Sequence, residues 1–451
     1  MREITVRDTL SREPQPIETG REVAIYACGP TVYSRIHIGN ARPFVVFSLF
    51  ARFLRAEGYR VRLVMNITDI NDKIYLAARE ADQPSDDLAA SMSRAYIEDT
   101  DRLELGRPDA EPLASETIEE IIELIEALIE RGHAYESGGD VYFRVRSFEG
   151  YGKLSNRDPA DMDQGEEAGS ESLKDDLLDF ALWKGHKQDE DTSWPSPWGP
   201  GRPGWHIECS AMAEAEVDEL PLEVHGGGSD LVFPHHENEL AQTEAGRGKP
   251  LARIWMHNGM VETDAEKMSK SEGNIFQLSE ALDRYGREAV VAYLLSGHYR
   301  QPLAFGPEPL EEAARRVEGL RNFFRENGAE GEPGEEAGAY RERFLDALAD
   351  DFNTPRALAV LAELVAEGNR RELPGAGAAL ASMLELLGLE SLAEVGEEAD
   401  EEAQRLLAER GRAREDGRFE DADRIRDQLA EHGWEVRDSA EGARLVRRGG
   451  D

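Results

Sequence analysis

The sequence contains only two cysteines, Cys28 and Cys209. Nothing in the chain indicates secretion, so a disulfide between them is disfavoured, and metal ligation and plain burial remain as competing interpretations. No run of about 18 apolar residues occurs, and the amino terminus lacks the apolar stretch of a signal peptide. These absences predict a soluble, cytoplasmic protein without a membrane partner.

Lysine is also scarce. Only eight of the 52 basic residues are lysines, and none follows Lys270. Two of the eight nevertheless stand in one short segment of small polar residues, Lys267-Met-Ser-Lys270-Ser. Their ammonium groups could neutralise the charge that develops on a triphosphate when its α-phosphorus is attacked. The alternative, a solvated basic turn, is less favoured because lysine is so rare elsewhere.

The formal net charge is -40. Such a charge would ordinarily argue against a nucleic-acid partner, because phosphate binding requires local Lys and Arg. Net charge describes the whole surface, however, and a basic track can lie within an acidic one. We therefore connect the acidic excess with solubility and, as a hypothesis, with a salty cytoplasm. A protein no more stable in molar KCl than at low salt would contradict that hypothesis.

Residues 23–65 have the pattern of a strand, a loop, a helix and a second strand. In such a unit the loop lies at the carboxyl end of a parallel sheet, where backbone N–H groups and the helix dipole favour phosphate. The loop contains His37-Ile-Gly39-Asn40, in which Gly39 would let a nucleotide approach the backbone and His37 could donate to phosphate oxygens. A dinucleotide site is disfavoured because the turn is not G-x-G-x-x-G. A histidine that merely caps the helix is the alternative.

A second glycine-rich turn follows a predicted strand near Val224 and reads His225-Gly226-Gly227-Gly-Ser-Asp230. Glycines without side chains would let the backbone lie against an adenosine, and Asp230 could accept hydrogen bonds from ribose hydroxyls. An ordinary loop is the alternative interpretation.

The segment from Pro234 is predicted to begin a helix. His235 and Glu239 are four residues apart and therefore share one helix face, whereas the same step from His236 reaches Leu240. With Cys28 and Cys209 they would form a plausible zinc shell of soft, borderline and hard donors. Spacing alone leaves open the alternative of two buried cysteines and a polar helix.

The motifs at His37 and Lys267 resemble the two signatures of class I aminoacyl-tRNA synthetases. Longer segments resemble the cysteinyl-tRNA synthetase family in particular, in order through almost the whole chain. These segments are Cys-Gly-Pro-Thr-Val-Tyr from Cys28, Asn-Ile-Thr-Asp from Asn66, Trp-His-Ile-Glu-Cys-Ser-Ala-Met from Trp205, His-Gly-Gly-Gly-Ser-Asp-Leu from His225 and Pro-His-His-Glu-Asn-Glu from Pro234. The chain departs from the family at Asn71, where an aspartate is usual, and near Leu445, where many relatives have a tryptophan.

The resemblance implies ligation of L-cysteine to tRNA(Cys) with ATP, through a cysteinyl-adenylate. It implies one Zn²⁺ per chain, Mg²⁺ with the ATP, and thiol recognition by the zinc; we also expect a monomer. The residues that it assigns are as follows: zinc ligands Cys28, Cys209, His235 and Glu239; cysteine contacts Cys28, Thr68 and Trp205; ATP contacts Gly39, His225, Gly226, Gly227, Asp230 and Lys270; catalytic residues His37, Asn40, Lys267 and Lys270.

The fold class implied is α/β, with a Rossmann-like parallel-sheet catalytic domain, an inserted connective-peptide domain, an α-helical bundle and a small C-terminal α+β module. The boundaries that we expect are 1–114 and 201–265 for the two catalytic halves, 115–200 for the insertion, 266–307 for the Lys267 loop and stem-contact region, 308–398 for the anticodon-binding bundle, and 399–451 for the C-terminal anticodon-contacting module.

Two other functions remain open. A related class of ligases makes the same adenylate but passes cysteine to a sugar amine, for which residues 308–451 would be unnecessary. A non-catalytic, zinc-dependent RNA-binding protein is disfavoured because both halves of the ATP site are intact. From periodicity alone, the bundle could equally serve dimerisation.

Overall fold

The computed structural model describes residues 2–159, 162, 172–217, 219–263, 266–267, 276–394, 401–415, 418–439 and 442–447. Residues 268–271 of the expected lysine motif, among them Lys270, lie outside the described residues, and of Lys267 the backbone alone is described. Within the described part of the chain, no helix has the length and apolarity needed to cross a membrane.

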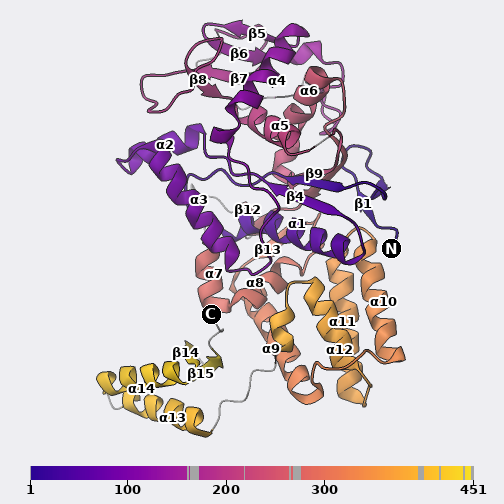
Figure 1. Cartoon of the computed structure of the whole chain (residues 1–451), viewed down its shortest axis with the longest axis vertical. Coiled ribbons are helices and arrows are strands. Elements are labelled where there is room, and N and C mark those ends of the chain that lie inside the picture. Colours follow the sequence, from indigo (N-terminus) through magenta and orange to yellow (C-terminus); the bar gives the residue numbers. More distant parts are fainter. Residues whose placement is uncertain are drawn as a thin grey trace.

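A four-stranded parallel sheet lies at the centre of the amino-terminal part of the chain (Figure 1). Its strand order is β10 (Ala252–Asn258), β9 (Leu222–Gly228), β3 (Val23–Ala27), β4 (Val61–Met65). Every neighbouring pair is parallel. Such strands are apolar because helices cover a parallel sheet on both faces. The predicted α/β class is confirmed.

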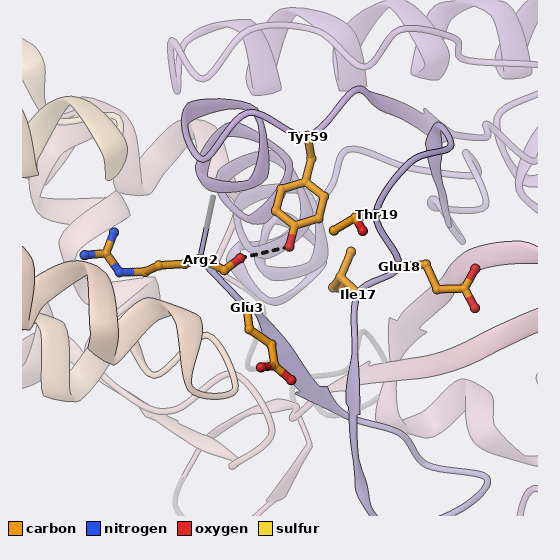
Figure 2. A pocket seen from close by; sticks show the side chains of 6 residues that line it. All are labelled: Arg2, Glu3, Ile17, Glu18, Thr19 and Tyr59. Carbon is orange, nitrogen blue, oxygen red and sulfur yellow. Dashed lines mark hydrogen bonds between the residues drawn. The ribbon is translucent and has the colours of Figure 1, made fainter.

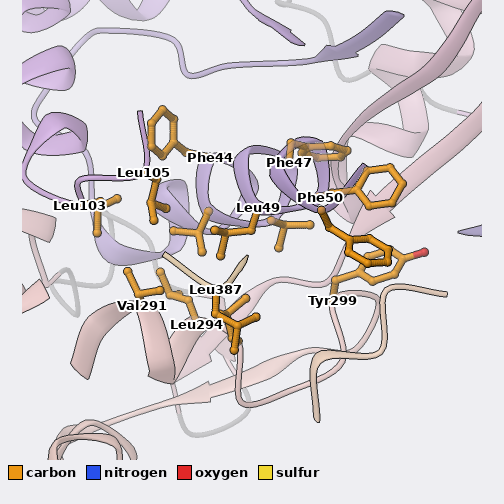
Figure 3. Close-up of a cluster of buried hydrophobic side chains, with 14 of the residues drawn as sticks. Phe44, Phe47, Leu49, Phe50, Leu103, Leu105, Val291, Leu294, Tyr299 and Leu387 are labelled. Carbon is orange, nitrogen blue, oxygen red and sulfur yellow. The ribbon is translucent and has the colours of Figure 1, made fainter. Parts of the chain in front are cut away.

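Helix α1 (Ile38–Ala56) connects β3 to β4, and most of its residues are buried. Its apolar face, including Phe44, Phe47 and Phe50, is buried. Figure 3 shows these rings among side chains from distant parts of the chain, including Leu294 and Leu387. One hydrophobic core therefore joins α1 to the helical bundle.

The chain between β4 and β9 carries an inserted unit, at the top of Figure 1. Two helices follow β4, α2 (Asp72–Glu80) and α3 (Ser85–Asp101), with Asp82 at a positive φ of 51° between them. Asn71 accepts a hydrogen bond from the backbone N–H of Lys73 and so caps α2. After α4 (Ile118–Glu130), an antiparallel sheet follows with strands β5 (Ala134–Ser137), β6 (Asp140–Phe143), β7 (Phe180–Gly185) and β8 (Gly201–Pro203).

Helices α5 (Trp205–Ala215) and α6 (Glu237–Arg247) return the chain to the central sheet. The helix expected from Pro234 begins later, because Val232–His236 forms a π-helical turn in which Phe233 is extended. Beyond β10 a small sheet has the order β12 (Glu266–Lys267), β11 (Val261–Thr263), β13 (Leu303–Phe305), with helices α7 (Leu278–Tyr285) and α8 (Arg287–Leu294) ahead of β13.

The expected bundle consists of α9 (Pro307–Asn327), α10 (Glu335–Ala349), α11 (Thr354–Arg370) and α12 (Ala376–Leu386). A last unit contains α13 (Glu401–Glu415), α14 (Phe419–Glu431) and a hairpin of β14 (Trp434–Ser439) and β15 (Gly442–Arg447). The short leading strands β1 (Thr5–Arg7) and β2 (Pro14–Pro16) pair antiparallel.

Candidate metal centre and nucleotide-facing turn

Four potential metal ligands converge at the carboxyl end of β3. Cys28 directly follows that strand, Cys209 lies in α5, His235 in the π-helical turn and Glu239 in α6. One donor atom from each lies within 4.8 Å of the others. All four side chains are buried, so separate segments of the chain place them in one enclosed space.

Both distances from the Cys28 sulfur match the ligand spacing around a single zinc ion, whereas His235 and Glu239 lie at hydrogen-bonding distance from each other. Cys28 Sγ lies 3.8 Å from His235 Nε2 and 3.6 Å from Glu239 Oε1, and these last two atoms are 2.9 Å apart. Bonds of about 2.0–2.3 Å to a tetrahedral zinc place its ligands roughly 3.3–3.8 Å apart. Glu239 Oε2 is buried and lies 3.0 Å from His225 Nε2. Two sulfurs, one imidazole and one carboxylate make a donor set that suits zinc.

The same four groups are strongly coupled electrostatically. Burial would raise the pKa of Glu239, but His235 and His225 hold it well below its usual range. Burial would lower the pKa of His235, yet Glu239 and Cys209 raise it to about 10. A hydrogen bond from Cys28 lowers the pKa of the Cys209 thiol to about 6, whereas burial raises the pKa of Cys28. A divalent cation would take the place of the protons shared within this set.

Trp205, expected near the amino acid, borders the centre, and Thr68, also expected there, lies by the loop that follows Cys28. The Trp205 ring stacks on His235 with a centroid distance of 4.4 Å and an interplanar angle of 20°. Thr68 is buried, and its N–H donates to the carbonyl oxygen of Pro30 at 3.1 Å, which ties it to the loop after Cys28. Asp69 next to it instead accepts from the N–H of Ser115 at 2.9 Å.

His37 immediately precedes α1, and Asn40 closes the first turn of that helix. The Asn40 side-chain oxygen accepts from the His37 N–H at 3.2 Å. A Cβ on Gly39 would lie 2.9 Å from the His37 ring, so glycine allows that ring its position. The N–H of Ile38 donates to the carbonyl oxygen of Phe276 at 3.1 Å. The chain that directly follows residues 268–275 is therefore attached to the His37 turn.

The segment predicted as a glycine-rich turn is mostly strand, because His225, Gly226 and Gly227 lie within β9 and pair with β10. His225 is fully buried, 3.0 Å from Glu239 Oε2 and stacked on Tyr26 at 5.2 Å, so the structure places it with the metal-ligand set. A Cβ on Gly226 would lie 2.2 Å from the Phe47 ring, and one on Gly227 would lie 3.0 Å from Leu231. Asp230 alone of the expected ATP contacts in this turn is exposed.

A separate hollow of about 500 Å³ is lined by residues that include Arg2, Glu18 and Tyr59 (Figure 2). The Tyr59 hydroxyl donates to the Arg2 carbonyl oxygen at 3.0 Å across it. Tyr59 precedes β4, so the hollow lies toward the amino end of the sheet. Ligands of open α/β sheets bind at the carboxyl end, and the hollow shares no residue with the metal-ligand set.

Comparison with known proteins agrees with this geometry. The family model described as tRNA synthetases class I (C) catalytic domain matches residues 14–315. A DALR domain matches residues 343–395, and a cysteinyl-tRNA ligase anticodon binding domain matches residues 397–445. The chain is 45% identical to the cysteine–tRNA ligase of Chromohalobacter salexigens over 98% of this chain and 99% of that protein.

The chain belongs to the cysteine–tRNA ligase family. It is likewise 44% identical to the cysteine–tRNA ligase of Rubrobacter xylanophilus, over 99% of this chain and 100% of that protein. Membership of this family makes it a class I aminoacyl-tRNA synthetase.

Solved structures confirm the fold of this cysteine–tRNA ligase family member. Mycobacterium tuberculosis methionyl-tRNA synthetase in complex with methionyl-adenylate superposes with a TM-score of 0.63 at 16% identity, covering 83% of this chain and 93% of that one. The leucyl-tRNA synthetase of an Agrobacterium radiobacter ternary complex gives 0.62 at 12% identity, covering 85% and 86%. The expected class I synthetase fold is confirmed.

Sequence reasoning missed a second layer of histidines around the ligands of this family member. His236 Nε2 lies 3.3 Å from Cys28 Sγ, although the helical step from His236 points away from Glu239. Cys28, His225, His236 and Glu239 also keep one donor atom each within 4.8 Å of the others. The adjacent histidines at 235 and 236 were the available signal, but a regular helix was assumed where the π-helical turn lies.

Proposed function

We propose that this protein ligates L-cysteine to tRNA(Cys) in two steps, with a cysteinyl-adenylate as intermediate, and that bound zinc selects the amino acid. The observation that supports this most directly is the buried set of Cys28, Cys209, His235 and Glu239. Family membership supports the overall reaction. We further propose that the protein acts as a monomer in the cytoplasm.

The nucleotide would lie along the carboxyl edge of the parallel sheet. There His37 and the backbone at Gly39 would hold the triphosphate, Asn40 would keep the His37 turn in shape, and Lys267 and Lys270 would neutralise its developing charge. Asp230 would accept from the ribose hydroxyls, with Gly226 and Gly227 keeping the neighbouring backbone close. Mg²⁺ would accompany the ATP. The cysteine carboxylate attacks the α-phosphorus, and pyrophosphate leaves.

Selection of cysteine would depend on its thiol. When bound, zinc supplies a Lewis acid that favours a thiolate over a hydroxyl. A free thiol has a pKa near 8.5, far below that of the serine hydroxyl, so only the cysteine side chain becomes an anionic ligand readily. Trp205 and Thr68 would border the amino acid. A missing ligand contact of this kind can give about 10⁴-fold discrimination without an editing site.

The acceptor would be RNA rather than a small molecule. Residues 343–395 and 397–445 match a DALR domain and a cysteinyl-tRNA ligase anticodon binding domain. A ligase that passes cysteine to a sugar amine would need neither. These matches favour tRNA(Cys) over the sugar-amine alternative.

Single-turnover charging with labelled cysteine tests the proposal. Bulk tRNA should become labelled in an ATP-dependent reaction, serine should not be accepted, and a glucosamine-type acceptor should remain unlabelled. The Cys209→Ser variant should lose zinc and weaken cysteine binding far more than ATP binding. Equal losses for the two substrates would refute thiol recognition, and labelling of the sugar alone would refute the tRNA acceptor. The Lys270→Ala variant should depress cysteine-dependent ATP–pyrophosphate exchange by orders of magnitude.

A further inference from the structure

A single row of hydrogen bonds leads from the Cys28 sulfur toward the amino-terminal segment. His236 Nε2 lies 3.3 Å from Cys28 Sγ, and His236 Nδ1 lies 2.7 Å from His257 Nε2. His257 Nδ1 in turn lies 2.7 Å from the Thr9 hydroxyl oxygen. His236 is fully buried, His257 is buried and Thr9 is half-buried. The row therefore connects a ligand in the interior with a residue close to the surface.

The backbone holds Thr9 in place independently of its hydroxyl. The Thr9 N–H donates to the carbonyl oxygen of Trp255 at 2.9 Å, and the Trp255 N–H donates to the Asp8 carboxylate at 2.8 Å. Trp255 lies in β10, two residues before His257. A change confined to the Thr9 side chain should consequently leave the segment docked on the sheet.

Once a metal is bound at Cys28, the donor and the acceptor of each hydrogen bond in this row are determined. A metal-bound thiolate has no proton to donate, so His236 must present an N–H at Nε2. A neutral His236 then accepts at Nδ1, which requires an N–H at Nε2 of His257. His257 in turn accepts at Nδ1 from the Thr9 hydroxyl. Burial lowers the pKa of His257 to about 3, so its ring is neutral, as this pattern requires.

We propose that Thr9 is a positioning residue that sets the tautomers of His257 and His236 and thereby gives the Cys28 thiolate its hydrogen-bond donor. Residues that form hydrogen bonds with metal ligands orient those ligands and adjust the charge that the ligands donate to the metal. A donor at Cys28 withdraws charge from the sulfur and leaves the metal better able to accept a further thiolate. This inference rests on the zinc site of the proposed function and assigns a role to a residue outside it.

The test compares Thr9→Val, which removes the hydroxyl at nearly constant shape, with Thr9→Ser, which keeps it. In zinc-loaded wild-type protein, ¹⁵N spectra of labelled histidines should show His236 and His257 as Nε2–H tautomers. Thr9→Val should give mixed tautomers and weaken zinc binding about tenfold in chelator competition. With Co²⁺ in place of zinc, its sulfur-to-cobalt absorption should move to longer wavelength. KM for cysteine should rise while KM for ATP stays constant. Thr9→Ser should match the wild-type protein in its histidine tautomers, zinc affinity, cobalt absorption and KM for cysteine.

The possible results distinguish a failure of this inference from a failure of the proposed function. A wild-type protein that binds no zinc would refute the metal site, and the inference with it. One zinc per chain with unchanged tautomers, zinc affinity and cobalt spectrum in Thr9→Val would overturn the inference alone, even if the unfolding temperature fell. Two metal ions per chain would also overturn it, because His236 Nε2 would then be a ligand rather than a donor.

Discussion

Nη1 of Arg42 donates a 2.6 Å hydrogen bond to the carbonyl oxygen of Gly259. Arg42 lies in the first turns of α1, and Gly259 stands directly ahead of β11, the strand that leads toward Lys267. The same guanidinium donates to the carbonyl oxygens of Met260 at 3.2 Å and His298 at 3.1 Å. It is fully buried, and burial lowers the pKa of Arg42 to about 10. One side chain thus joins the His37 helix to two later segments.

We predict that Arg42→Met destabilises the protein by about 3 kcal/mol, because buried carbonyl groups would lose their charged donor. ATP–pyrophosphate exchange should fall further than the loss of folded protein explains, since α1 and β11 would no longer share a fixed spacing. Urea unfolding and exchange assays measure the two effects. Arg55→Met, on the same helix but with a more exposed side chain bonded to Asp109, is the control and should change exchange little. Equal behaviour of the two variants would contradict the prediction.

His235→Asn should abolish stoichiometric zinc binding. The imidazole is one of four buried donors, and zinc sites with three protein donors bind more weakly than complete ones. Metal analysis after dialysis should give about one zinc in wild-type protein and close to none in the variant. His133→Asn is a matched control, because His133 lies in the inserted unit and bonds to Ser147 at 2.8 Å. Retention of zinc by His235→Asn would remove this residue from the ligand set.

Gly226→Ala should lower the free energy of unfolding by about 1–3 kcal/mol, the usual cost of overpacking a filled core. The added Cβ would lie 2.2 Å from the Phe47 ring and 2.6 Å from the Met256 carbonyl oxygen. Gly319→Ala is the matched control, because no atom lies within 4 Å of a Cβ in that exposed turn of α9. The control should be neutral or slightly stabilising, since alanine favours helix by up to about 1 kcal/mol. A stable Gly226→Ala variant with weakened ATP binding would instead favour a direct nucleotide contact.

The spacing of residues along the sequence predicted the pairing of His235 with Glu239. His235 and Glu239 are four residues apart, and their side chains meet at 2.9 Å. The strand, helix and strand at 23–65 were likewise predictable, because each has an uninterrupted apolar pattern. The meeting of Cys28 with Cys209 was not predictable from spacing, because it depends on how α5 packs against the central sheet; the family resemblance supplied it.

The sequence did not predict the contacts of His236 and Gly226, because both residues contact segments that are distant in the chain. The partners of His236 are Cys28, which follows β3, and His257, in β10. No periodicity relates those positions, and a single π-helical turn rotates His236 toward them. Gly226 was interpreted through nucleotide approach, but its close neighbour Phe47 comes from α1. In each case the tertiary packing of two elements decides which way a residue faces.

Glu223, at the start of β9, should make stability depend on pH in the acidic range. Its carboxylate is buried and accepts from the Glu18 N–H at 2.7 Å, Arg21 Nη2 at 2.8 Å and Arg253 Nε at 3.0 Å. Burial would raise the pKa of Glu223, but the hydrogen bonds and charge of Arg253 lead the effects that lower it. A folded-state pKa below the unfolded value of about 4.3 means that the carboxylate stabilises the fold above that pH. The contribution is lost as the pH falls through the folded-state pKa.

Glu223→Gln should therefore cost about 2 kcal/mol at neutral pH and progressively less below pH of about 4, because the wild-type carboxylate then takes up a proton, first in the unfolded chain and at lower pH in the folded protein. Urea unfolding between neutral and acidic pH measures the difference between the two proteins. Glu219→Gln is the control, because Glu219 is 81% exposed and pairs with Lys249 at 3.5 Å; surface pairs of this kind contribute little. The wild-type and Glu223→Gln curves should converge toward acid pH, since protonation and amidation both remove the same negative charge. A difference that stays constant across the range would mean that Glu223 stabilises the fold through shape and packing instead.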